Sequence, residues 1–508
     1  MKLLRVLTIL TVAIVGFGQE LAAYRYYVPL PEKTFSGEWN YVFEGGVFSE
    51  GPHFVRITGY NVLGYESYQY DEMQFEGPSG FAFFPFGTPD ETPSSKMFAV
   101  QSLIFESDSQ LEGVLWMVHR ETGQLNAVSM NLDGQSEVII PQIGTDYFAW
   151  KSGFALMGIG SEAASEANLN FRFYDLQQDS HNTELWSGLV DRGYIKKTPY
   201  FDVFLGDLDA PIAASWGKVI SSNPNFQLTG FQTFSRVNGS LQSCAFELNS
   251  GPLSQGSFSL RPINEQVQYS LTMTNSLTRD VDVTLSLHYL RTVIDPEEEI
   301  SFQQLEREDI QLVLAGNGRL SGGVGSSWFA ELFEDEAVQP LRVSFETDSL
   351  FEYNEALEEQ IEVISPIHVL AFAVGGVDAL GATTLVAPGN SSEFWLTNQS
   401  MVERTLVLQN VTDEVTPIGV TIYAEDGKIV GHNAKELAPS EVWSIQEVDL
   451  KPLFGESDVP VALRFSISSE LGFFTLDMFA KNDVDIAWVN LPLEKVVPVE
   501  EEGLPDFP

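Results

Sequence analysis

The chain is poor in cysteine, and its 508 residues contain only Cys244. A disulfide within the chain is therefore excluded, and only a bond between two molecules could use this thiol. Domains of about 100 residues or more bury enough apolar surface to fold without cross-links, so this absence does not exclude an exported protein. Cys244 lies in the strand-like run 241–248 without a neighbouring basic residue. This environment predicts a buried apolar side chain rather than a nucleophile.

Basic residues are also scarce. The chain has 27 lysines and arginines against 71 aspartates and glutamates, which leaves a net charge of −44 at pH 7. A surface of this sign repels polyanions, so we expect neither nucleic acid nor an anionic membrane surface as a partner. Hydrophobic residues make up 44% of the chain and aromatic residues 12%. Because this content is enough to build cores, the composition excludes a generally disordered chain.

Catalytic motifs are a third absence. None of the six histidines stands at metal-ligand spacing from another, and neither the His-Glu-x-x-His nor the Gly-x-Ser-x-Gly motif occurs. His288 and His368 lie in strand-like runs, where we expect packed side chains. Carboxylates are too numerous for any one pair to indicate a glycosidase. We therefore predict a protein that is not an enzyme, while a catalytic set assembled across the fold stays an open alternative.

The N-terminus has the layout of a secretory signal peptide. Two basic residues precede an apolar run over 7–17, and the sequence Leu-Ala-Ala ends the segment at residue 23. This layout predicts a signal peptide over 1–23, with an uncleaved anchor or a first helix as the alternative. No later stretch is apolar for long enough to span a membrane as a helix. We expect a soluble product that is secreted or held at the cell surface, with the periplasm as a further option.

An alternating apolar strand that ends on a tyrosine recurs along the chain. Its copies end at Tyr60, Tyr174, Tyr289 and Tyr423, a spacing of about 115 to 134 residues that is typical of tandem domains. A hydrophobic strand, a turn and another strand follow each copy. Each unit is best explained as two antiparallel sheets packed face to face. The prediction is an all-β chain, a tandem array of about four β-sandwich domains, against the alternative that β-rich segments align by chance.

The two patterns together place the domain boundaries. After the signal peptide we expect an aromatic-rich β domain (24–136), a β-sandwich (137–250), a β-sandwich with a helical insertion (251–385), a β-sandwich (386–493) and a disordered acidic tail (494–508). The helix is expected over 296–308. Asp295, Pro296 and three following glutamates combine a capping side chain, a proline at the first helical position and negative charge at the positive end of a helix dipole.

Two sets of side chains are candidates for ligand sites. Acidic turns concentrate the oxygen ligands that calcium prefers, and the candidates are Asp280, Asp282, Asp483 and Asp485. Aromatic rings can stack on sugars, and the candidates in the first unit are Tyr60, Tyr65, Tyr68 and Tyr70. Ordinary acidic turns and packed aromatic residues are the alternative explanations. Calcium is the only cofactor that the sequence suggests.

The fourth unit resembles a known class of module. Its segment 394–398, its strand ending at Asn410 and its segment 422–427 follow the pattern of the immunoglobulin-like modules of secreted bacterial surface proteins. The resemblance implies an extracellular scaffold or adhesive role, although a fold alone does not fix a function.

Three functional hypotheses follow from these observations. The leading one is a secreted, non-enzymatic array of β-sandwich domains that binds a surface, a polymer such as a polysaccharide, or an extracellular partner protein. The second is a carbohydrate-binding or carbohydrate-processing protein that uses the aromatic first unit. The third is a structural subunit that self-associates through exposed sheet edges.

Overall fold

The computed structural model describes residues 24–30, 39–61, 65–87, 100–129, 134–143, 150–160, 169–174, 180–186, 195–198, 215–221, 223, 226–236, 243–248, 251–260, 267–294, 301–354, 359–364, 366–375, 379–398, 402–454, 461–482, 485–491 and 493–496. The predicted signal peptide and residues 497–508 of the predicted tail lie outside the described residues. Within these ranges, no helix has the length and apolarity needed to cross a membrane.

The described strands group into four units along the chain. The first contains β1 (Tyr24–Pro29), β2 (Trp39–Val47), β3 (His53–Tyr60), β4 (Glu66–Gln69), β5 (Met73–Phe75), β6 (Ser79–Phe83), β7 (Ser102–Ser107), β8 (Leu111–His119) and β9 (Leu125–Ser129). The second contains β10 (Glu137–Ile140), β11 (Trp150–Gly160), β12 (Leu169–Tyr174), β13 (Ser180–Trp186), β14 (Ile195–Thr198), β15 (Trp216–Ser221), β16 (Phe226–Arg236) and β17 (Ser243–Glu247).

The third and fourth units are built in the same way. The third contains β18 (Gln255–Ser259), β19 (Val267–Thr274), β20 (Val281–Ile294), β21 (Ser301–Leu314), β22 (Arg319–Gly323), the π-helix η3 (Val324–Trp328), α3 (Ala330–Glu334), β23 (Val338–Thr347), β24 (Ser349–Asn354), β25 (Glu359–Ile364), β26 (His368–Gly375) and β27 (Ala379–Thr384). The fourth contains β28 (Ser391–Thr397), β29 (Arg404–Asn410), β30 (Thr416–Ala424), β31 (Ile429–Leu437), β32 (Val442–Gln446), α4 (Glu447–Phe454), β33 (Ala462–Ser468), β34 (Phe474–Lys481) and β35 (Ile486–Asn490).

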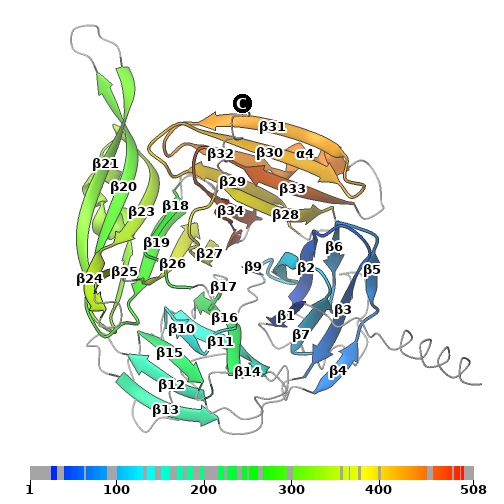
Figure 1. Ribbon diagram of the computed structural model, residues 1–508. Coiled ribbons are helices and arrows are strands. Elements are labelled where there is room, and N and C mark those ends of the chain that lie inside the picture. Colours follow the sequence, from blue (N-terminus) through cyan, green and yellow to red (C-terminus); the bar gives the residue numbers. More distant parts are fainter. Residues whose placement is uncertain are drawn as a thin grey trace, which may run out of the picture.

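All four units share one strand order (Figure 1). In the fourth unit the first sheet has the order β28-β33-β30-β31 and the second the order β32-β29-β34-β35. The second unit repeats it as β10-β15-β12-β13 and β14-β11-β16-β17. The third unit adds the β24–β25 hairpin, and in the first unit β4 and β5 both pair with β3. The structure thus confirms an all-β tandem array of antiparallel β-sandwiches.

The sequence landmarks occupy equivalent strands. The tyrosine strands are β3, β12, β20 and β30, and the hairpins that follow are β8–β9, β16–β17, β26–β27 and β34–β35. In β30, Ile418, Val420 and Ile422 are buried while the residues between them are partly exposed. Because side chains alternate between the two faces of a strand, one face supplies the core and the other the surface. Cys244 is buried in β17, as predicted.

The helix predicted over 296–308 is wrong for its described part. Residues 301–308 belong to β21, a strand of 14 residues that pairs along its whole length with β20. Glu306 accepts hydrogen bonds from Arg291 (2.8 Å) and Tyr289 (3.0 Å) across the hairpin. The predicted helix rested on local capping signals, whereas cross-strand contacts decide the structure. Residues 295–300, which carry those signals, lie outside the described residues.

The first residues of the predicted disordered tail, 494–496, have a defined structure. Glu494 forms a β-bridge with Ser391, and the Val496 amide donates to the side chain of Asn390 at 2.7 Å. These residues are therefore attached to the fourth unit.

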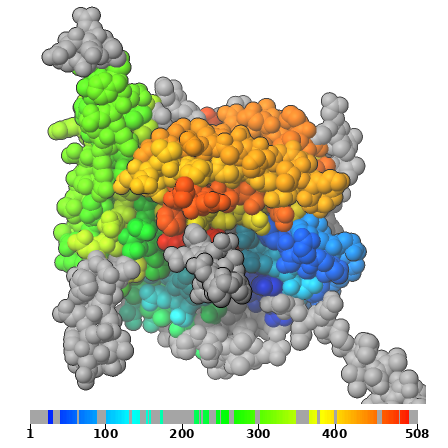
Figure 2. Space-filling view, turned by 45° about the horizontal axis from the view of Figure 1, so that its top comes forward, coloured from blue at the N-terminus to red at the C-terminus, as the bar shows by residue number. Residues whose placement is uncertain are grey.

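The four units close into a ring (Figure 1). Their last strands, β9, β17, β27 and β35, meet at the centre, where each contacts two of the others. Around the ring, β1 of the first unit packs on β11 and β16 of the second, and β28 of the fourth packs on β2, β6 and β8 of the first. The array is therefore closed rather than extended. Figure 2 shows the fourth unit (orange) lying against both the third (green) and the first (blue).

At the centre of the ring, carboxylate side chains accept hydrogen bonds from backbone amides at the edges of neighbouring strands. Asp485, which is fully buried, accepts the backbone amides of Leu125 (3.0 Å) and Leu380 (2.8 Å) from the first and third units. Glu247 accepts the amide of Ser129 at 2.6 Å. An unpaired strand edge that is buried must find hydrogen-bond partners. The carboxylates supply them and hold the units together.

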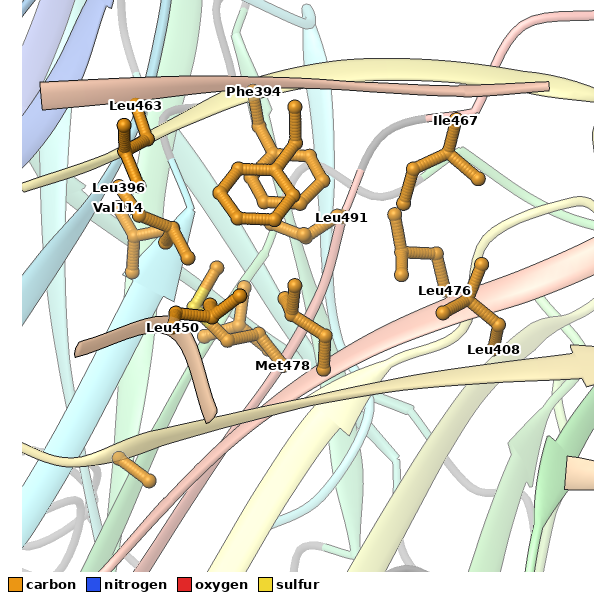
Figure 3. Close-up of a cluster of buried hydrophobic side chains, with 14 of the residues drawn as sticks. Val114, Phe394, Leu396, Leu408, Leu450, Leu463, Ile467, Leu476, Met478 and Leu491 are labelled. Carbon is orange, nitrogen blue, oxygen red and sulfur yellow. The ribbon is translucent and has the colours of Figure 1, made fainter. Parts of the chain in front are cut away.

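The contact between the fourth and first units, the closing interface, contains a continuous apolar core. The cluster that fills the fourth unit extends to Val42, Val114 and Trp116 of the first. Figure 3 shows Val114 among side chains of the fourth unit, close to Leu396 and Leu463. Each large side chain buried in such a core contributes about 1.5–3 kcal/mol, so the closure has a substantial hydrophobic component.

An ion pair is buried in the same interface. Arg404 of β29 pairs with Glu44 of β2, and both side chains are almost completely inaccessible to solvent. Glu447 also pairs with Arg404 at 2.9 Å. Trp116 donates its indole N–H to Glu44 at 3.1 Å. All charges of this network have partners, which is the condition under which a buried ion pair is tolerated.

Candidate ligand pocket between the third and fourth units

A cavity of about 330 Å³ opens between the third and fourth units. Strands β18, β20 and β23 of the third unit form one wall, and loops of the fourth unit around residues 411–413 and 473 form the other. Its polar lining includes Ser257, Ser286, His288, Arg342, Ser344 and Thr412. The β pairing places them, because Arg342 lies directly opposite His288 on β20 and Ser259 on β18.

Arg342 and His288 form the buried part of this wall. Arg342 is 3% exposed and donates from Nη1 to the carbonyl of Val411 at 2.6 Å, across the boundary between the units. Its Nη2 lies 3.1 Å from Nδ1 of His288. The other ring nitrogen of His288 lies 2.9 Å from Oγ of Ser344. The three side chains therefore form one hydrogen-bonded chain along the cavity.

Burial and like charge set the protonation state of this chain. Desolvation, followed by the charges of Arg342 and Arg307, lowers the pKa of His288 to about 3, so the imidazole is neutral at physiological pH. Desolvation also lowers the pKa of Arg342 to about 10. The guanidinium stays protonated at neutral pH and is the buried positive charge of the cavity.

The other charged side chains of the lining balance one another, so Arg342 leaves the lining with one positive charge in excess. Arg307 and Lys495 add two positive groups to the lining, and Glu346 and Asp413 add two negative ones. Arg307 pairs with Asp309 at 2.6 Å, and Lys495 lies over the ring of Phe473 at 5.6 Å. A basic lining differs in sign from the protein as a whole, which carries a net charge of −44.

The hydrogen bond between Ser344 and His288 joins the same two groups as the nucleophile and general base of a serine hydrolase. A general base works best with a pKa near the operating pH, and the pKa of His288 lies far below it. The far side of the imidazole faces a cation, Arg342, where a hydrolytic triad places a carboxylate. This arrangement suits hydrogen bonding to a bound group better than proton abstraction.

The predicted calcium ligands belong to two separate acidic turns, 280–282 and 482–485. Asp280 is exposed and accepts the amide of Gly316 at 2.9 Å, and Asp282 is exposed on β20. Asp485 is buried at the ring centre, where backbone amides occupy it. Asp483 lies outside the described residues. No group of three or more histidine, cysteine or acidic side chains placed to hold a metal ion occurs in the described ranges.

The predicted tyrosines of the first unit lie in different environments. Tyr65 is 61% exposed. Tyr68 and Tyr70 pack edge to face with ring centroids 4.7 Å apart, and the Tyr70 hydroxyl donates to the carbonyl of Pro85 at 2.8 Å. Tyr60 packs against a small cluster that includes Met157 of the second unit. The structure brings two of the four rings into contact and presents no flat row of them.

Sequence reasoning missed the cavity, although one signal was present. The segment 341–344, Leu-Arg-Val-Ser, recurs as Leu-Arg-Phe-Ser at 463–466, on the equivalent strand of the fourth unit. Arg464 stacks over the ring of Tyr423 at 4.6 Å, whereas Arg342 faces His288. The repeated segment gives both arginines the same local sequence. Their surroundings differ because different residues from other parts of the chain pack against them.

Comparisons with known proteins add little to this geometry. No protein-family model matches the chain, and no curated protein matches its sequence. Among solved structures, the crystal structure of red sea bream transglutaminase aligns with 13% sequence identity over 49% of this chain and 32% of that one, with a TM-score of 0.11. The chain thus matches about a third of the length of that enzyme. A TM-score this low supports no inference about fold or activity.

Proposed function

We propose that the protein is an extracellular, non-enzymatic binding protein that holds a polymer or partner at the cavity between its third and fourth units. The observation that carries this proposal is the cavity itself, with its chain of Arg342, His288 and Ser344. Its walls come from two units that the closed ring keeps in fixed positions, so the polar groups are preorganised for a ligand. The extracellular location rests on the N-terminal sequence pattern.

The electrostatics favour binding over catalysis. A neutral imidazole of very low basicity and a buried guanidinium can orient a ligand by hydrogen bonds and charge, and neither can act as a base at neutral pH. The cavity volume of about 330 Å³ is at the lower end of the range for small-molecule sites. It fits one side group or one sugar residue of a larger ligand.

Filling the cavity tests the proposal. The variant Ser344→Tyr places a ring in the lumen, and the matched variant Ser468→Tyr places the same ring on the exposed end of β33. Retention on a panel of immobilised polysaccharides and extracellular matrix proteins, with and without calcium, is expected to fall at least tenfold for Ser344→Tyr and to stay unchanged for Ser468→Tyr. Equal retention of both variants would contradict a binding site in the cavity.

A second candidate function, a self-associating structural subunit, is favoured by β21. This strand is the unpaired edge of its sheet and projects with β20 beyond the ring (Figure 1). Phe302 and Val313 on it are 48% and 65% exposed. An exposed edge with apolar side chains is a template for pairing with a second copy. If it acts so, sedimentation velocity will show a concentration-dependent dimer that Val313→Lys abolishes, and a monomer at all concentrations would exclude this function.

A further inference from the structure

Among the residues that the structure describes, two deeply buried arginines have opposite surroundings. Arg404 is 2% exposed and pairs with two carboxylates, Glu44 and Glu447. Arg342 is 3% exposed, and within the described part of the chain it has no carboxylate at ion-pair distance. Its Nε also lacks a hydrogen-bond partner among the described residues. A buried charge without a paired carboxylate is costly, and here the guanidinium lines a cavity in which Asp413 is a negative charge beyond ion-pair distance.

The charge of the whole protein limits what can supply the counter-charge. A net charge of −44 repels polyanions over most of the surface. Within this acidic field, three cationic side chains line the cavity, Arg342, Arg307 and the exposed Lys495, against two carboxylates, which makes it a local basic spot. Such a spot suits a single anionic group on an otherwise neutral ligand better than a densely charged chain.

The rest of the lining matches a sugar. Ser257, Ser286 and Ser344 line the cavity with hydroxyl oxygens. Ser257 donates its proton to the carbonyl of Val343 at 3.1 Å and Ser344 bonds to His288, so these oxygens offer acceptors to the hydroxyls of a sugar. Phe473 is 41% exposed, and Lys495 lies over one face of its ring, which leaves the opposite face for a ligand. Aromatic faces with a few convergent polar groups are the usual composition of such sites.

We infer that the cavity binds one acidic sugar residue, whose carboxylate or sulfate group is recognised by Arg342 and Lys495 and whose hydroxyls bond to the serines. This inference rests on the proposed binding function and specifies its ligand class. It predicts recognition of a sparsely charged polysaccharide and rejection of a heavily sulfated one.

Calorimetric titration of the full mature chain at fixed ionic strength tests the inference. The probes are glucuronate, a monosulfated monosaccharide, glucose, and a short peptide with a free C-terminal carboxylate. We expect saturable binding of glucuronate or the sulfated sugar, which separates the two sources of the oxyanion, and at least tenfold weaker binding of glucose. A peptide that binds more tightly than both acidic sugars would overturn the assignment to a sugar.

Three variants locate the binding. Arg342→Met is expected to weaken acidic sugar binding at least tenfold, and Lys495→Met, at an exposed position that leaves the core intact, about threefold or more, in line with a solvent-exposed charge contact. Arg464→Met is the matched control on the equivalent strand and is expected to bind normally. If both single variants, Arg342→Met and Lys495→Met, bind acidic sugar normally, the inference is overturned. If Arg342→Met does not fold, normal binding by Lys495→Met alone overturns it.

The outcome also separates this inference from the proposed function. If Ser344→Tyr abolishes retention on a neutral polysaccharide while no acidic sugar binds, the binding function stands and the acidic ligand is wrong. If Ser344→Tyr changes nothing on any support and no sugar binds, both fail.

Discussion

Replacing Glu44 by alanine is expected to destabilise the protein by about 3–5 kcal/mol, the usual cost of removing one partner of a buried ion pair. Glu44 is 3% exposed and accepts hydrogen bonds from Trp116 and Arg404. Without it, Glu447 is the one carboxylate that still pairs with Arg404 among the described residues, and the Trp116 indole N–H loses its acceptor. The free energy of unfolding from urea denaturation measures the loss, and calorimetry shows whether the first and fourth units still unfold together.

The control for this prediction is an ion pair on the surface. Glu403 pairs with Lys451 at 2.8 Å, and both side chains are largely exposed. Because solvent and salt screen such a pair, Glu403→Ala is expected to leave the unfolding curve unchanged. A similarly small effect of Glu44→Ala would mean that Glu447 alone neutralises Arg404, and that the apolar core carries the closure of the ring.

The second large effect concerns pH. Asp477 on β34 is 1% exposed, and Trp488 donates to it at 2.8 Å. Burial raises its pKa to about 7, so the folded state keeps a proton that the unfolded state releases near pH 4. This contribution to stability is complete below about pH 4 and disappears as the pH rises to 7 and beyond. Stability is therefore expected to fall between about pH 4 and pH 7, with an upper bound of about 4 kcal/mol from this residue.

Asp477→Asn removes the titration and keeps the shape of the side chain. The variant is expected to be more stable than the wild type at pH 8, to match it near pH 4, and to show a flatter profile of unfolding free energy against pH. Glu247, whose pKa burial raises to about 7, adds a slope of the same sign that persists in the variant. Asp426→Asn, at an exposed turn where Lys428 lowers the pKa, should leave the slope unchanged. An unaltered slope in Asp477→Asn would show that Asp477 is ionised in the folded protein.

Local sequence patterns predicted most strands correctly, but they predicted a helix where pairing with a neighbouring strand determines the structure. The alternation in 416–424 and the recurring tyrosines follow from the period of a strand, which every copy expresses in its own residues. The segment 301–308 has helix-start signals before it, yet it forms a strand because β20 pairs with it over its full length. Asp280 and Asp485 were each proposed as calcium ligands because they lie in acidic turns, while their places in the fold, exposed and central, depend on the packing of the units.

The sequence by itself determined the β-sandwich class, the repeated order of strands, the burial of Cys244 and the acidic surface, because each depends on composition or on residues close together in the chain. Only the tertiary structure decided that the units close into a ring and that a cavity forms between two of them. Arg342 and Arg464 stand in nearly identical local sequences, and one lines a cavity while the other stacks on Tyr423. Their different surroundings come from residues far away in the chain, such as Val411 beside Arg342, and no local pattern specifies such contacts.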